Sequence, residues 1–283
     1  MIAAACLKWV VQWPEATTVL ADELPDGRFA GVSAADRAAL EWALHTRDVS
    51  AAAGRARTPV VAVTVGPPGA DSVLRDALAC GADRAIRIDL PFGAPSRAVA
   101  VAVAASLRHL LDACSTIWCG DHSFDRGTGS VPAYLADELG IMQALGLVGV
   151  ELADGAITAL RRLDGGRRER LSITGPAVLS VEGSTAMLRR APLRGLLARP
   201  AIEVVTVDAG ASGPVVPAHP TESRPYRPRA RTYAPPSGRT ALERVKSLTA
   251  AGAAVAHGET VTLEPDAAAE RILAALSEWG YLP

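Results

Sequence analysis

The sequence predicts an α/β domain, in which a mostly parallel β-sheet is flanked by helices and followed by an antiparallel extension and a C-terminal helical arm. Three observations favour this class. Short apolar runs alternate with Ala-rich helical runs through the first half of the chain, as in parallel strands joined by right-handed crossovers. Apolar residues make up 49% of the 283 residues and aromatics only 4%, which favours an Ala, Val and Leu core. Pro, Gly, Ser and Arg are then concentrated beyond residue 207, as in a linker.

The first half of the chain contains four expected strands, at residues 2–11, 59–66, 84–90 and 115–120. The run "PVVAVTVG" is apolar throughout, as in a strand that is buried on both faces. Helices are expected between the strands. Ser33 is a suitable N-cap for residues 33–48, and Gly81 is a suitable end for the next helix. Two more helices are expected, at residues 94–113 and 131–140.

The second half follows a different pattern. Alternating apolar positions and a "DGG" turn over residues 144–183 predict an antiparallel extension of the sheet. A short basic helix and a final strand complete a domain at residues 1–207, and residues 208–239 have a linker composition. We expect residues 240–283 to form a helical arm. It contains an amphipathic helix with Asp266 as its cap and an apolar stripe of Ile272, Leu273, Leu276 and Trp279.

Composition argues against several classes of protein. The net charge is −1, so no overall field draws the chain to nucleic acid or to a membrane. The N-terminus does not have the pattern of a signal peptide, and no apolar run is long enough to cross a bilayer. Cys6, Cys80, Cys114 and Cys119 form no C-x-x-C pair. We therefore expect reduced thiols in a cytoplasmic protein, and no zinc site.

One stretch, "CGDHSFDRGTGSVPAYLADELG" from Cys119 to Gly140, places a Gly-rich turn between a strand and a helix. The free N–H groups and the dipole of a helix N-terminus attract anions. Gly127 and Gly129 would let the backbone approach a phosphate, with Thr128 and Ser130 as hydroxyl donors. The pattern is neither a dinucleotide nor a triphosphate loop. Its spacing alone leaves phosphate binding and an ordinary crossover both open.

Catalytic patterns are scarce. A second loop, Val65-Gly66-Pro67, ends a strand at the edge where ligands bind, but alone it indicates a tight turn. None of the five histidines lies in a triad context. His122, next to Asp121, is interpreted as an exposed polar residue of the loop. No catalytic residue is therefore predicted.

Longer motifs resemble one family. The segment "VTVGPPGADSVLRDALACGADRAIRI" is similar to V-x-x-x-G-P-x-x-x-x-x-x-L-R-x-A-L-A-x-G-A-D-R of electron transfer flavoprotein β subunits. The stretch from Cys119 resembles the C-G-x-x-x-x-D-x-x-T-G-x-V-x-x-x-L-A-x-x-L-G of the same family. The segments "RRLDGGRRERLSITGPAVLSVEG" and "LRGLLARPAIEVVTV" match its hairpin and a later basic segment. The resemblance covers roughly residues 1 to 207.

The resemblance implies a fold of the adenine nucleotide α-hydrolase-like class and a heterodimer with an α subunit. Such a subunit has no catalytic residues of its own and carries electrons from a dehydrogenase to a quinone-reducing or other acceptor. FAD is implied mainly on the α subunit, with a structural AMP in the β subunit. The C-terminal arm would dock on the α subunit. By resemblance, Trp13 would lie near the flavin and Leu193 would dock the partner. The implied AMP site consists of Cys6, Ser33, Ala34, Ala35, Asp36, Val65, Gly120, Asp125, Arg126, Gly127, Thr128, Gly129, Ser130 and Val131.

The chain departs from the family pattern at several positions. The N-P-[FY]-[DE] before the first helix is Ser33 to Asp36, a basic residue is replaced by Asp121, and Gln by Ser130. The L-N-E-P-R-Y of the docking loop is replaced by "STAMLRR". These changes put the adenine contacts and the choice of partner in question. With the longer Pro-rich tail, they suggest a divergent, actinobacterial-type branch, for which a mycofactocin-linked alcohol-oxidation system is one option.

Two alternatives stay open at this point. One is a stand-alone adenine-nucleotide-binding protein, although the chain has neither an S-G-G-x-D-S loop nor a phosphate-binding lysine motif. The other is a bifurcating relative with a second FAD in place of AMP. The segment "GAPSRAVA" lacks the D-T-x-A-T pattern expected for that second FAD, so AMP is preferred.

Overall fold

The computed structural model describes residues 1–11, 30–112, 115–153, 156–206, 236, 238–251 and 261–281. Nine of the described strands form one sheet in the order β11-β5-β4-β1-β6-β10-β7-β8-β9, and β2 pairs with β3 separately. The strands are β1 (Ala3–Leu7), β2 (Val10–Val11), β3 (Ala30–Gly31), β4 (Val60–Val65), β5 (Arg84–Asp89), β6 (Thr116–Gly120), β7 (Met142–Ala153), β8 (Ala156–Arg162), β9 (Arg168–Ile173), β10 (Ala177–Val181) and β11 (Glu203–Thr206). This α/β architecture agrees with the predicted class.

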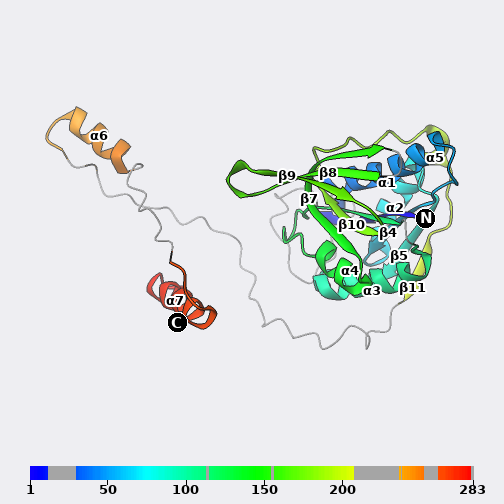
Figure 1. Cartoon of the computed structure of the whole chain (residues 1–283). Coiled ribbons are helices and arrows are strands. Elements are labelled where there is room, and N and C mark those ends of the chain that lie inside the picture. Colours follow the sequence, from blue (N-terminus) through cyan, green and yellow to red (C-terminus); the bar gives the residue numbers. More distant parts are fainter. Residues whose placement is uncertain are drawn as a thin grey trace. The chain divides into compact units, whose positions relative to one another are not determined.

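Helices cover both faces of the parallel part of the sheet (Figure 1). Alternate residues of β1 serve the two faces: Ala3 and Ala5 pack in the core under α1 and α2, and Ala4 packs in the core under α3 and α4. Small side chains on strands and helices let the layers lie close together. The helices are α1 (Ala34–Ala52), α2 (Asp71–Cys80), α3 (Ser96–Leu107), α4 (Val131–Leu139), α5 (Leu193–Leu197), α6 (Ala241–Ala251) and α7 (Pro265–Glu278).

The strand order creates a crevice between β1 and β6. From β1 the chain proceeds to β4 and β5 on one side, and then returns to β6 on the other side. The loops that follow β1 and β6 therefore diverge at the carboxyl edge of the sheet. Ligands of open α/β sheets bind at such a reversal of strand order.

The expected strand 2–11 ends early, at Leu7. The backbone N–H of Lys8 donates to the Asp36 carboxylate at 3.0 Å instead of to a neighbouring strand. The chain then leaves the sheet, and Val10–Val11 pairs antiparallel with β3. The interruption brings Lys8 and Trp9 to the carboxyl edge of the sheet.

The antiparallel extension is smaller than the sequence predicts. β8 and β9 pair antiparallel at the sheet edge. β10, which was expected to continue the extension, instead lies between β6 and β7 and is parallel to both. All five residues of β10 are buried, which a central strand requires. The expectation was wrong here because an apolar run does not show which strands it pairs with.

The chain divides into two compact units, residues 1–225 and 226–283. In the second unit, α6 begins with a capping box, in which the Thr240 hydroxyl accepts from the Glu243 N–H and the Glu243 carboxylate accepts from the Thr240 N–H. The N-cap of α7 is Glu264, so the expectation that Asp266 is the cap was wrong. Pro265 at the first position starts the helix two residues earlier. None of the described helices combines the length and apolar character that a membrane crossing needs.

Candidate functional site

A cavity opens at the carboxyl edge of the sheet, in the crevice between β1 and β6. It is bounded by the ends of β1 and β4, by the β5–α3 loop, and by the loop from β6 to α4. Its lining residues are Cys6, Leu7, Lys8, Trp9, Asp36, Val63, Thr64, Val65, Pro91, Phe92, Gly93, Ala94, Ser96, Val99, Val103, Cys119, Gly120, His122, Ser123, Asp125, Arg126, Thr128, Gly129, Ser130, Val131 and Pro132. The strand order thus brings together segments that are more than a hundred residues apart.

Asp36 lies at one wall of the cavity, in the first turn of α1. Its backbone N–H donates to the Ser33 hydroxyl at 3.0 Å, so Ser33 caps the helix as predicted. Burial raises the pKa of the Asp36 carboxyl to about 6, although hydrogen bonds from Lys8, Ser33 and Gly120 act in the opposite direction. Asp36 therefore links β1, α1 and the start of the β6–α4 loop.

The β6–α4 loop turns its backbone toward the cavity. Gly127 and Gly129 have φ of 63° and 58°, the left-handed region that favours glycine. A Cβ atom on Gly129 would lie 2.3 Å from the Asp121 carbonyl oxygen, so only glycine fits there. The hydroxyls of Thr128 and Ser130 are 3.0 Å apart at the start of α4. The loop therefore presents small polar groups and a helix N-terminus to the cavity.

An ion pair and a hydrogen bond fix this loop. Lys8 Nζ lies 2.6 Å from Asp125 Oδ2. Burial acts to raise the pKa of Asp125, but hydrogen bonds from Lys8 and Ser123 outweigh it and hold that pKa below its usual value. Next to Asp125, the Arg126 guanidinium donates to the Gly93 carbonyl at 2.6 Å. The loop is thus tied to β1 on one side and to the β5–α3 loop on the other.

The structure separates the predicted site residues into three groups. Among the described residues, Ser33, Ala34, Ala35 and Gly127 do not line the cavity, although Ser33 and Ala35 support residues that do. Trp13 lies outside the described residues. The predicted residues that do line the cavity are Cys6, Asp36, Val65, Gly120, Asp125, Arg126, Thr128, Gly129, Ser130 and Val131.

Sequence reasoning missed Lys8, Trp9 and the β5–α3 loop. Trp9 is 5% exposed, and its indole N–H has no hydrogen-bond partner among the described residues. Its ring packs edge-on against Phe92, with centroids 6.1 Å apart. The sequence placed Lys8 inside the expected strand 2–11, so no local pattern marked it; the early end of β1 at Leu7 brings it to the edge where ligands bind. His122 is half-exposed and pairs with Asp121 at 2.8 Å, as expected of a polar loop residue.

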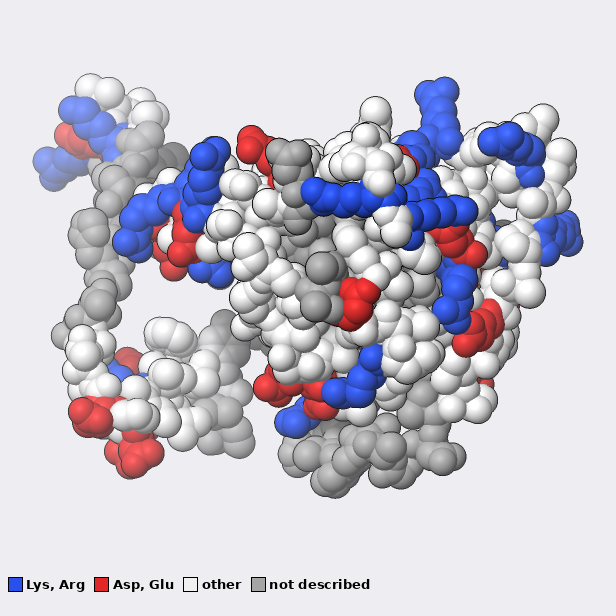
Figure 2. All heavy atoms as spheres, turned by 45° about the vertical axis from the view of Figure 1, so that its right-hand side comes forward, with Lys and Arg blue, Asp and Glu red and all other residues white. Residues whose placement is uncertain are grey.

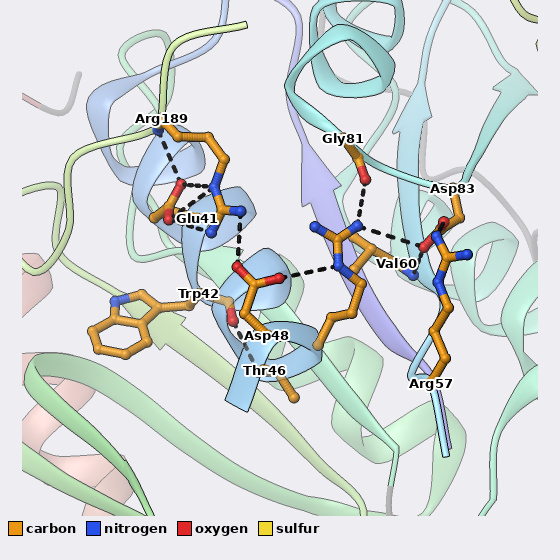
Figure 3. Close-up of polar contacts among 10 residues, drawn as sticks. Glu41, Trp42, Thr46, Asp48, Arg57, Val60, Gly81, Asp83 and Arg189 are labelled. Carbon is orange, nitrogen blue, oxygen red and sulfur yellow. Dashed lines mark hydrogen bonds and ion pairs between the residues drawn. The ribbon is translucent and has the colours of Figure 1, made fainter. Parts of the chain in front are cut away.

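A second feature lies away from the cavity, along the other side of α1. Figure 3 shows Glu41 and Asp48 facing the Arg189 guanidinium. Arg189 Nη2 donates to Glu41 at 2.7 Å, and Nη1 lies 2.8 Å from Asp48. The backbone N–H of Arg189 also donates to Glu41, at 2.9 Å. The Trp42 indole N–H donates to the Thr185 hydroxyl. Helix α1 therefore holds the segment 182–197 by several polar contacts.

The free side of segment 182–197 is apolar with a basic surround. Leucines of α5 and Met187 are exposed, at 71% for Leu193 and 91% for Met187. Arg190 and Arg194 are exposed beside them. Figure 2 shows Lys and Arg side chains gathered over the upper part of the globular unit, where α5 and α1 lie in Figure 1. An exposed apolar patch with a charged rim is typical of an interaction surface.

Comparison with known proteins identifies the family. The electron transfer flavoprotein domain matches residues 30–224. The electron transfer flavoprotein subunit beta of Syntrophomonas wolfei is 30% identical over 196 residues, covering 67% of this chain and 75% of the relative. The electron transfer flavoprotein subunit beta of Mycobacterium tuberculosis is 33% identical over 171 residues, which cover 60% of this chain and 63% of the relative. Protein FixA of Azorhizobium caulinodans is 31% identical over 186 residues, which cover 63% of this chain and 64% of the relative. The chain therefore belongs to the electron transfer flavoprotein β-subunit family.

Proposed function

We propose that this chain is the β subunit of a heterodimeric electron transfer flavoprotein, which carries electrons from a dehydrogenase to a quinone-reducing or other acceptor. The proposal assigns a structural AMP to the β1–β6 cavity and FAD mainly to the α subunit, at the interface. One observation carries it: in a member of this family, the cavity at the reversal of strand order ends in a Gly-rich loop and a helix N-terminus.

The residues present fit a nucleotide monophosphate. The Gly129 turn brings the backbone to the cavity at a position where a Cβ would collide with Asp121. Backbone N–H groups at the start of α4 and the hydroxyls of Thr128 and Ser130 are suitable phosphate donors. Lys8 adds a cation beside them, held by Asp125. AMP would supply the negative charge that these donors attract, and it would join the loops after β1, β5 and β6.

Electron transfer itself belongs to the flavin, whose redox chemistry FAD supplies when it is bound to the complex. The role that we assign to this chain is to complete the flavin site and to recognise partners. Trp13 is proposed to lie near the flavin, on the basis of the family resemblance alone. No group of three or more His, Cys, Asp or Glu side chains among the described residues is arranged for a metal, and none of the proposed roles needs one.

We assign partner docking to segment 182–197, with Leu193 as the apolar anchor. Leu193, Leu196 and Leu197 project from α5 with 71%, 56% and 72% of their surface exposed. The basic rim of Arg190 and Arg194 would suit a donor dehydrogenase with an apolar pocket and acidic surroundings. The clamp from Arg189 to Glu41 orders the segment before the partner arrives, which lowers the entropy lost on docking.

The C-terminal helices α6 and α7 are proposed to dock on the α subunit. Ile272, Leu273 and Trp279 of this unit are each more than half exposed. An amphipathic helix with its apolar stripe exposed needs a surface to cover. The proposed linker at residues 208–239 is long enough to reach beyond the domain that precedes it.

Co-expression with the α chain of the same organism tests the heterodimer. We expect a yellow one-to-one complex with a flavin absorption spectrum, which reduces in the presence of the donor dehydrogenase and its substrate. Deleting residues 240–283 should weaken the complex while the remaining unit stays folded. A stable, colourless chain that does not bind the α chain would contradict the proposal.

A further inference from the structure

Two cysteines face each other on the floor of the cavity. Cys6 of β1 and Cys119 of β6 are register partners in neighbouring parallel strands, and both side chains line the cavity. Strand neighbours lie about 4.8 Å apart, within the range of about 4.4–6.8 Å between the Cα atoms of a disulfide. Register partners also direct their side chains to the same face of the sheet. The backbone therefore already meets the main geometric requirement for a bond between the two sulfur atoms.

The two thiols differ in environment. Cys119 is 4% exposed, and Cys6 is partly exposed to the cavity. A hydrogen bond with Cys6, burial and the nearby Asp36 charge all raise the pKa of the Cys119 thiol. Cys119 therefore remains protonated and is placed to donate to the Cys6 sulfur. Cys6 is the sulfur that a small reagent entering the cavity reaches first, with Cys119 behind it as the resolving thiol.

We propose that Cys6 and Cys119 form a redox-active dithiol, which a hydroperoxide converts to a disulfide across the cavity floor. The Cys6 thiolate attacks one peroxide oxygen and the O–O bond breaks. For hydrogen peroxide, the leaving hydroxide takes up the one proton that Cys6 gave up on forming its thiolate, and becomes water. Cys6 is then a sulfenic acid. The Cys119 sulfur attacks the Cys6 sulfur, the S–O bond breaks, and a second water leaves with the Cys119 proton. Two thiols and one peroxide thus give one disulfide and two waters.

The disulfide reshapes the floor under the proposed nucleotide, and this step rests on the proposed function. Bond formation draws the sulfur atoms from contact distance to about 2.05 Å and moves the ends of β1 and β6, which carry Lys8 and Gly120. Bound AMP covers the thiols and slows their oxidation. Because its floor is reshaped, the oxidised chain binds AMP more weakly, by roughly tenfold for a coupling of ordinary size.

Intact-mass analysis of the full-length chain, in complex with its α subunit, tests the dithiol. Treatment with hydrogen peroxide, followed by alkylation in denaturant, should leave two thiols of the wild type unalkylated until a reductant is added. Peptide mapping should locate the link between Cys6 and Cys119. Cys6→Ala and Cys119→Ala should each abolish the link, and Cys80→Ala, as matched control, should retain it. Cys6→Ser provides a second variant should Cys6→Ala fail to fold.

The outcomes separate this proposal from the proposed function. The wild type is treated with peroxide at concentrations that oxidise free thiols. If both Cys6 and Cys119 can still be alkylated afterwards, the dithiol proposal is overturned, whatever nucleotide is bound. Loss of two alkylatable thiols from Cys6→Ala, as in the wild type, would overturn it too. The same oxidation is then repeated on nucleotide-stripped protein, with and without added AMP. Slower oxidation with AMP supports the coupling, and equal rates overturn it without affecting the disulfide itself.

Discussion

Helix α1 holds two segments, of which one lines the cavity with small polar groups and the other exposes apolar side chains at the surface. Its first turn, through Asp36, fixes the loops around the cavity, and its middle, through Glu41 and Asp48, fixes segment 182–197. The cavity loop turns its backbone inward, with small polar side chains and glycines. Segment 182–197 makes its polar contacts with the helix and turns leucines outward. The difference indicates that one segment serves an internal ligand and the other an external partner.

The comparison also predicts that the two roles are separable. Changes in the cavity loop should affect the bound nucleotide and the stability, and changes in segment 182–197 should affect partner kinetics. Substitutions at Gly129, Asp36, Glu41 and Leu193 test that separation.

Gly129→Ala should have the largest effect. Its Cβ would lie 2.3 Å from the Asp121 carbonyl oxygen, at a φ of +58°. Strain and displacement together should cost about 3 kcal/mol of unfolding free energy, and the nucleotide should be lost. Gly127→Ala is the matched control, because its nearest atom is 3.9 Å away at a similar φ. It should cost about 1 kcal/mol. Urea unfolding measures the free energy of unfolding of each variant, and the nucleotide content is measured beside it. Equal losses of unfolding free energy in the two variants would contradict the close approach at Gly129.

Asp36 should make stability depend on pH. Its pKa is raised from 3.8 to about 6 in the folded chain, so the folded state holds a proton that the unfolded state has lost. This group's contribution to stability is therefore greatest at low pH, and it falls by up to about 3 kcal/mol as the pH rises from about 4 to 6. Asp36→Asn should remove this fall. Urea unfolding of the two proteins across that range measures it, and parallel stability curves would refute the assignment.

Glu41→Gln should loosen segment 182–197. It removes the carboxylate that receives the Arg189 side chain and backbone N–H. We expect a loss of about 2 kcal/mol in unfolding free energy, a higher KM for the donor dehydrogenase, and an unchanged nucleotide content. Asp48→Asn is the control, because Asp48 is 43% exposed and its contact should contribute about 0.5 kcal/mol. Loss of nucleotide in Glu41→Gln would show that the two segments are not separable.

Leu193→Ala should change partner recognition with almost no effect on the fold. The side chain is 71% exposed, so stability should shift by less than about 0.5 kcal/mol. Loss of an apolar anchor should raise the KM for the donor roughly tenfold, with kcat preserved. Val204→Ala, on the edge strand β11 and 50% exposed, should leave KM unchanged. An unaltered KM in Leu193→Ala would remove Leu193 from the docking surface.

The sequence predicted local elements better than pairings. Ser33 caps α1, and Gly81, at a φ of 115°, ends α2, because caps depend on the few residues around them. The central position of β10 was missed, because it depends on contacts with β6 and β7, which are distant in sequence. A strand at residues 59–66 and a helix at residues 131–140 were also predicted, each from a short pattern. The structure places them at Val60–Val65 and at Val131–Leu139, with Gly140 as the C-cap.

Only the part of the candidate site that has a local sequence pattern was predicted from the residues themselves. The Gly-rich loop is visible in the sequence because positive φ and a helix N-terminus have local signatures. The pairs Lys8–Asp125 and Cys6–Cys119 each join segments more than a hundred residues apart. Periodicity and spacing do not show that those segments meet, and only the family resemblance placed Cys6 and Asp125 in one site. The strand order brings them together.

Identification of the bound nucleotides tests whether the β1–β6 cavity holds AMP. The purified complex of this chain with its α subunit is denatured, and the released nucleotides are separated and quantified by chromatography. We expect about one equivalent each of AMP and FAD per heterodimer, with AMP absent from the Gly129→Ala complex. Two equivalents of FAD without AMP, or FAD alone in one equivalent, would contradict the assignment of AMP to the β1–β6 cavity.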